Sequence, residues 1–117
     1  ILKFKQIAKE IKIIADRNNV ETYFVYIPSL YRIQNNKNLK FIEKKDNGSS
    51  AYDDIFAYSK IKNIVNHLNF NIIDLNSDFF AKQAEPEKFF TRSYRSHFTI
   101  DGYKKISVFL YDSLNYN

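Results

Sequence analysis

Three segments of the chain repeat apolar residues at the three- and four-residue spacing of an amphipathic helix. The first segment runs from Leu2 to Arg17, and its apolar stripe consists of Phe4, Ile7, Ile11 and Ile14. Lysines and acidic residues occupy most of the positions between them. We therefore expect a helix whose stripe faces a core. Asn18 and Asn19 should end it, because asparagine tolerates the left-handed conformation that closes helices.

Two further segments show the same spacing. The second runs from a capping signal at Ser50 to about Leu68, with Asp53 and Asp54 suited to the positive end of the helix dipole. Its stripe consists of Tyr58, Ile61, Val65 and Leu68. The third segment follows Thr99, which can cap it. The residues that we expect on its buried side are Tyr103, Ile106, Phe109, Leu110 and Leu114.

Two short apolar runs without helical spacing predict β-strands. They are Thr22 to Ile27, which Pro28 stops, and Phe70 to Leu75. Continuous apolar runs of this length suit strands that are buried on both faces of a parallel sheet. Between them, residues 30–48 form a polar, basic connection with room for one short helix, and long loops of this kind are often functional.

The alternation of helices and strands predicts an α/β fold with a parallel sheet covered by helices. More specifically, we expect a three-layer α/β/α sandwich with a flavodoxin-like sheet. Two strands shield three helices poorly, so we interpret residues 1–117 as a single domain that is the C-terminal part of a larger one. The chain starts at Ile1 and contains no Met, and we therefore expect the natural N-terminus upstream.

Composition narrows the function classes. The chain is 44% hydrophobic and 17% aromatic, enough for a packed core. It has no Cys, which excludes disulfides and thiolate metal sites, and no apolar run long enough for a transmembrane helix. The net charge of +5 would suit nucleic acid or an anionic membrane surface. Because no Arg-rich or Gly-aromatic motif supports nucleic-acid binding, we rank that function last.

Candidate chemistry centres on His97, in the stretch SYRSHFTIDGYKKISVFLYDSL. Ligands of open parallel sheets gather beyond the carboxyl ends of the strands, and the loop after the second strand leads toward His97. A neutral imidazole there could accept a proton near physiological pH. We interpret the other histidine, His67, as structural, at a helix end where a cation suits the dipole. Two isolated histidines do not predict a metal site.

The segment from Phe89 to Leu114 resembles the C-terminal block of the SGNH hydrolases, also called the GDSL lipase/esterase family. Members commonly carry the catalytic His in a loop, then a small polar residue, a Gly and an aromatic residue that opens the final helix. Here the matching residues are His97, Phe98, Thr99, Gly102 and Tyr103. The preceding order of elements also fits, so the resemblance covers essentially the whole chain as the second half of that family's domain.

The resemblance implies a serine hydrolase, an esterase, deacetylase or acyl transferase acting on O-acyl esters of a carbohydrate or a lipid. His97 would be the general base, no cofactor would be needed, and the nucleophilic Ser would lie upstream in a Gly-Asp-Ser block that this sequence lacks. The family usually has an Asp three residues before the His, where this chain has Tyr94. A backbone carbonyl could orient His97 instead, Asp74 or Asp78 could replace the acid, or the site could be degenerate.

Other candidates have structural interpretations that we prefer. Ser29 follows the first strand and could line a cleft, but no strained Gly-x-Ser-x-Gly turn surrounds it. Four lysines make the long connection basic and could attract an anionic substrate. The pairs Phe79-Phe80 and Phe89-Phe90 should pack in the core rather than contact an acyl chain. The main alternative function is a non-catalytic SGNH-like module that binds a glycan or a protein.

Overall fold

The computed structural model describes residues 1–30, 32–33, 50–91 and 97–115, and of residues 50–56 only the backbone. In this part the chain is a mixed α/β structure, mostly helical, with a small parallel sheet. The elements, in chain order, are α1 (Leu2–Arg17), β1 (Tyr23–Tyr26), α3 (Ser50–His67), β2 (Asn71–Asp74), the short α4 (Leu75–Asp78), the 3₁₀ helices η1 (Phe80–Lys82) and η2 (Pro86–Phe89), and α5 (Ile100–Asn115). The long connection between β1 and α3 lies mostly outside the described residues.

The three predicted helices and both predicted strands are confirmed, with shorter strands than expected. Helix α1 ends at Arg17, and Asn19 after it has a φ of 52°, the left-handed conformation expected of a closing asparagine. Asn69 plays the same part between α3 and β2, with a φ of 57°. The capping role of Ser50 and the side chains of Asp53 and Asp54 lie outside the described residues.

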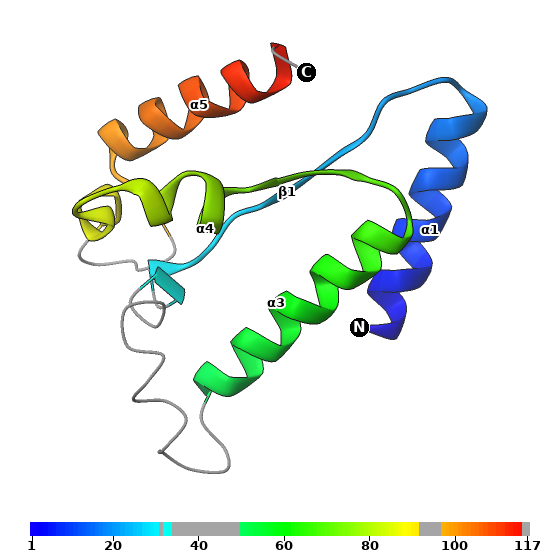
Figure 1. Ribbon diagram of the computed structural model, residues 1–117, viewed down its shortest axis with the longest axis horizontal. Helices are drawn as coiled ribbons and strands as arrows, with labels where there is room; N and C mark the ends of the chain where they lie inside the picture. Colours follow the sequence, from blue (N-terminus) through cyan, green and yellow to red (C-terminus); the bar gives the residue numbers. More distant parts are fainter. Residues whose placement is uncertain (31, 34–49, 92–96, 116–117) are drawn as a thin grey trace.

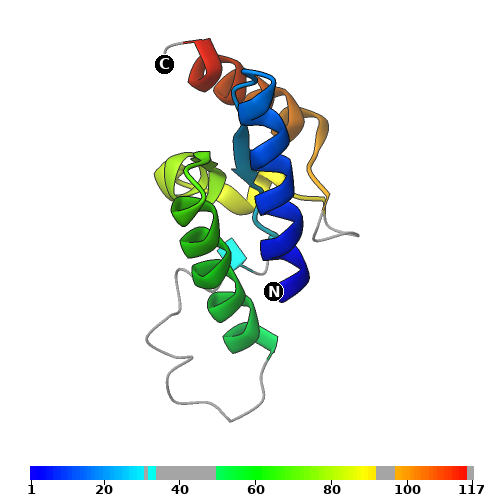
Figure 2. The same cartoon turned by 90° about the vertical axis from the view of Figure 1, so that its right-hand side faces the viewer.

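Strands β1 and β2 pair in parallel, with Tyr23 opposite Asn71 and Tyr26 opposite Asp74. Alternate side chains point to opposite faces of the sheet. On one face, Phe24 contacts Phe4 of α1, and Tyr26 contacts Tyr58 of α3. On the other face, Tyr23 and Val25 pack against the buried core, against which Phe109 and Leu110 of α5 also pack. Figures 1 and 2 accordingly show α5 and α3 on opposite sides of the strands.

An aromatic cluster forms the core between α5 and the sheet. The pairs Phe79-Phe80 and Phe89-Phe90 are all buried, so the packing role predicted for them is confirmed. Phe80 contacts Phe89, Phe90 and Phe98, with ring centroids 5.3–6.1 Å apart. The remaining buried members of this core include Leu30, Ile33, Ile73, Leu75 and Ile106.

Three expectations about burial are wrong. All four residues of β1 are only partly buried. The α1 stripe does not face a core: Ile7, Ile11 and Ile14 are 56, 49 and 61% exposed, and the buried residues of α1 are Ala8 and Ala15. On α5, Ile106 is buried and Phe109 and Leu110 are half-buried, while Tyr103 and Leu114 are exposed.

Candidate functional site

Asp74 lies at the carboxyl end of β2, where its side chain accepts hydrogen bonds from two residues of α3. One carboxylate oxygen, Oδ2, accepts from Lys62 Nζ at 2.8 Å and from the Tyr58 hydroxyl. The other, Oδ1, accepts from the backbone N–H of Asn76 at 3.0 Å and so caps α4. We call Tyr58, Lys62 and Asp74 the Asp74 cluster. Every hydrogen bond that the Asp74 carboxylate accepts stabilises its charged form.

The electrostatics of the Asp74 cluster follow from burial and these hydrogen bonds. Burial alone would raise the pKa of Asp74, but the hydrogen bonds from Lys62 and Tyr58 outweigh it, and the pKa lies below its ordinary value. The hydrogen bond to Asp74 raises the pKa of Lys62. Burial, followed by the hydrogen bond to Asp74, raises the pKa of Tyr58. The carboxylate therefore stays ionised, the lysine charged and the phenol neutral around physiological pH.

Residues that follow β1 complete this edge of the sheet. The guanidinium of Arg32 lies over the Tyr58 ring, 4.2 Å from its centroid, and the Tyr26 ring packs 4.6 Å from the same ring. Ser29 Oγ accepts a hydrogen bond from the backbone N–H of Arg32 at 3.3 Å, which starts a helical turn. The carboxyl ends of the two strands are thus fixed to α3 by polar and aromatic contacts.

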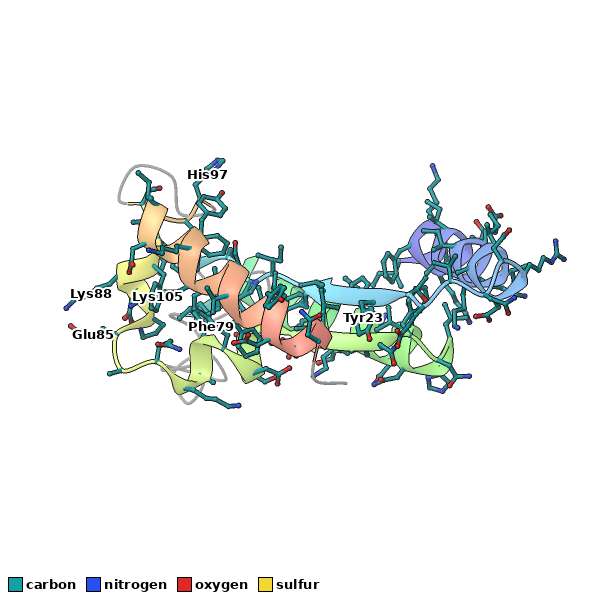
Figure 3. The ribbon with its side chains drawn as sticks, turned by 90° about the horizontal axis from the view of Figure 1, so that it is seen from above. Tyr23, Phe79, Glu85, Lys88, His97 and Lys105 are labelled. Atoms are coloured by element: carbon teal, nitrogen blue, oxygen red, sulfur yellow. The ribbon has the colours of Figure 1, made fainter. Side chains whose placement is uncertain are left out.

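His97 is exposed and stands directly before α5. Thr99 caps α5 as predicted, since its Oγ1 accepts from the backbone N–H of Gly102 at 3.0 Å. The first turn of α5 lies at the end of the molecule toward which both strands run, opposite α1 (Figure 1). Figure 3 shows the His97 side chain projecting outward from that end. The ring is therefore accessible to a reactant from outside the described core.

The backbone around His97 is paired with the segment after η2. Phe90 and Phe98 form an isolated antiparallel bridge, in which the His97 carbonyl accepts from the N–H of Thr91 at 2.9 Å. Phe98 is buried in the aromatic core. Because neighbouring residues of an extended segment point to opposite sides, burying Phe98 turns His97 toward solvent.

The structure does not bring the candidate acids to His97. Tyr94 lies outside the described residues. Within the described part of the chain, the Asp74 carboxylate bonds to the partners given above. Asp78 Oδ2 accepts from the backbone N–H of Asp74, and its Oδ1 accepts from Ser77 Oγ. Both residues act as turn and cap formers, the structural role that strand-end aspartates commonly have.

Sequence reasoning missed Tyr58, Lys62 and Arg32 as members of the strand-end site. Tyr58 and Lys62 lie one turn apart on α3, a spacing typical of any helix face, and their partner Asp74 comes 16 and 12 residues later. The one feature of the sequence that could have indicated the site is Lys62, a charged residue next to the apolar stripe position Ile61. Their contact depends on the tertiary crossing of α3 and β2.

The described residues provide no further candidate site in the form of a metal centre, a second histidine site or a pocket at His97. No group of three His, Cys, Asp or Glu side chains in this part is arranged to hold a metal ion. His67 is exposed, and its Nδ1 lies 2.7 Å from the carbonyl of Asn63, one turn earlier on α3. A shallow groove of about 480 Å³ lies along α5, but His97 is not among its lining residues. None of the described helices is long and apolar enough to cross a membrane.

Comparison with known proteins adds no relative. The sequence matches no protein-family model, and no curated protein and no solved structure is significantly similar to the chain.

Proposed function

We propose that this chain is the C-terminal part of an SGNH-like serine hydrolase that cleaves O-acyl esters of a carbohydrate or a lipid. In this proposal the two strands belong to the flavodoxin-like sheet of a three-layer α/β/α sandwich. The catalytic Ser lies in a segment that precedes Ile1. His97 is the general base. The observation that carries the proposal is the exposed His97 directly before the Thr99-capped start of α5, at the end toward which the parallel strands run.

The arrangement of α1 supports a larger sheet. Helix α1 leads into β1 and contacts Phe24, on the face that α3 also contacts through Tyr26. A parallel strand at the outer edge of β1, followed by α1, would make a right-handed crossover, the hand that such connections almost always have. The exposed Ile7 and Ile14 of α1 would cover that strand. The two faces and the free edge thus suit a sandwich with further strands beside β1.

The chemistry follows from general acid–base catalysis. His97 would take the hydroxyl proton of the Ser as its oxygen attacks the ester carbonyl, and would then protonate the leaving alcohol. In the second half, His97 would take a proton from water as the water oxygen attacks the acyl-enzyme. It would then give that proton to the Ser oxygen as the acid is released. An exposed imidazole can exchange protons in both halves, and no metal is required for these steps.

A test of this role uses the two histidines of the sequence. In the full-length protein, His97→Ala should abolish hydrolysis of a small ester such as p-nitrophenyl acetate, because the Ser then has no base. His67→Ala is the matched control, since His67 is also exposed but lies at the end of α3. Hydrolysis that survives His97→Ala, or that is lost equally in both variants, would contradict the role.

A second candidate is a non-catalytic SGNH-like module that binds a glycan or a protein. Two observations favour it: the sequence has Tyr94 where the family has its Asp, and the carboxylates of Asp74 and Asp78 are used elsewhere. Without an acid, the imidazolium formed during catalysis lacks its usual stabilisation. The two candidates differ in turnover, because the binding module hydrolyses no ester and its ligand binding does not depend on proton acceptance by His97.

A further inference from the structure

The start of α5 makes an unusually close backbone contact with the end of η2. A Cβ atom added to Gly102 would lie 2.5 Å from the carbonyl oxygen of Phe89, and 3.2 Å from both Phe98 Cβ and Thr99 Oγ1. The first of these separations is closer than real Cβ atoms come, and the atom it meets belongs to the backbone. Only glycine fits at this position without moving one of the two segments.

The same carbonyl fixes Thr99. Phe89 O accepts from the backbone N–H of Thr99 at 2.8 Å and from Thr99 Oγ1 at 3.3 Å. Thr99 Oγ1 in turn accepts from the N–H of Gly102. We call Phe89, Thr99 and Gly102 the Phe89–Gly102 contact. It joins the last residue of η2 to the first turn of α5 by hydrogen bonds and by close packing together.

This contact lies two residues from His97. The two hydrogen bonds that flank Phe98 run from Thr91 N–H to His97 O and from Thr99 N–H to Phe89 O. Phe98 between them packs on Phe80, Phe90 and Tyr103, with centroids 4.9–5.8 Å apart. The backbone of His97 is thus fixed on its C-terminal side, although its ring is exposed.

Glycine is rare in this chain, so its presence at position 102, within a helix, calls for a structural reason. The chain has only two glycines, and a glycine inside a helix costs about 1 kcal/mol relative to alanine. Its φ does not lie in the left-handed region, so backbone conformation does not require it. The contact with Phe89 accounts for it.

We propose that Thr99 and Gly102 are positioning residues for His97, and that the Phe89–Gly102 contact sets where the imidazole stands relative to the reacting groups. The expected effect on kcat rests on the proposed hydrolase function. The immobilisation of the His97 backbone rests on the described geometry alone. Neither residue touches substrate in this proposal, since each acts through the backbone of His97.

The kinetic test compares matched variants in the full-length protein. Gly102→Ala should lower kcat about 10- to 100-fold with little change in KM, since a displacement near 1 Å misaligns the base without removing substrate contacts. Thr99→Val, which removes the capping oxygen, should have the same effect. Thr99→Ser keeps that oxygen and should restore kcat. A rise in KM without a fall in kcat would overturn the proposal. Equal activity of Thr99→Val and Thr99→Ser would overturn it as well.

A second measurement separates this inference from the function. Comparison of the wild type with His67→Ala and His97→Ala assigns the ring Hε1 proton NMR signals of these two histidines. Gly102→Ala should shift and broaden the His97 signal and leave that of His67 unchanged, whether or not any ester is hydrolysed. An unchanged His97 signal would overturn the positioning role. Changes at both histidines would mean general unfolding and would overturn it as well. If the wild type hydrolyses no ester but Gly102→Ala still changes the His97 signal selectively, the hydrolase function is rejected and the positioning of His97 stands.

Discussion

Asp74 joins β2 to α3 through one carboxylate that is almost inaccessible to solvent. Its side chain is 4% exposed, whereas that of its partner Lys62 is 33% exposed. Removing one member of a buried ion pair leaves the other charge uncompensated, which is costly in the interior. The partial exposure of Lys62 moderates that cost, because the ammonium can turn toward water.

Asp74→Asn should therefore lower the free energy of unfolding by about 1–3 kcal/mol, less than for a completely buried pair. Urea titration measures this difference. The matched control is Asp16→Asn, which removes the same charge from the i,i+4 pair of Lys12 and Asp16 on α1, where the acid is 59% exposed. That change should cost no more than about 0.5 kcal/mol. Equal effects at the two sites would contradict a structural role for the Asp74 cluster.

The pKa directions in the Asp74 cluster predict a pH window of stability. The folded pKa of Asp74 is lowered, so its contribution is present above the unfolded value, about 4, and is lost as pH falls through the folded pKa. The pKa values of Lys62 and Tyr58 are raised, so their contributions are present below about 10 and are lost as pH rises through the folded values. Thermal unfolding from pH 2 to 11 should show both losses. In Asp74→Asn the acid-side loss should be smaller, and an unchanged acid limb would contradict this.

At the scale of elements, the hydrophobic pattern predicted which segments are helices and strands but not which faces are buried. Spacing alone placed α1, α3 and α5 correctly, because amphipathic periodicity is a local property. The burial of Ile7 or Ile14 depends on which element lies opposite, and no element of the described structure covers these two side chains. Thr99 and Asp74 were predictable as caps from residue type, whereas the contact of Gly102 with Phe89 is tertiary and has no local signal.

The exposed stripe of α1 predicts association of the isolated chain. Three isoleucines, each about half exposed or more, form an apolar stripe on one helix that water solvates poorly. In sedimentation velocity, the 117-residue chain should show concentration-dependent self-association. The double variant Ile7→Lys, Ile14→Lys should suppress it. Gln6→Lys, at an exposed polar position of α1, adds charge without removing apolar surface and serves as the control. Equal suppression by Gln6→Lys would attribute the effect to charge.

For the whole molecule, the α/β class was predictable from the alternation of elements, and the described structure confirms it. The continuous apolar run of β1 predicted a strand covered on both sides, but its residues are only half-buried. His97 stays a prediction from its sequence context. The Asp74 cluster was not predicted, because it requires three residues from two elements to meet. Contacts of this kind depend on the packing of α3 across β2 and not on any local spacing.

The measurement that tests the central claim most directly is labelling of the full-length protein with a fluorophosphonate, followed by peptide mapping. The account predicts one labelled Ser, in a segment that precedes Ile1, because an activated serine reacts with such probes. Labelling should be lost in His97→Ala and kept in His67→Ala. If no serine is labelled, or if labelling does not depend on His97, the hydrolase account is wrong and the binding module becomes the better interpretation.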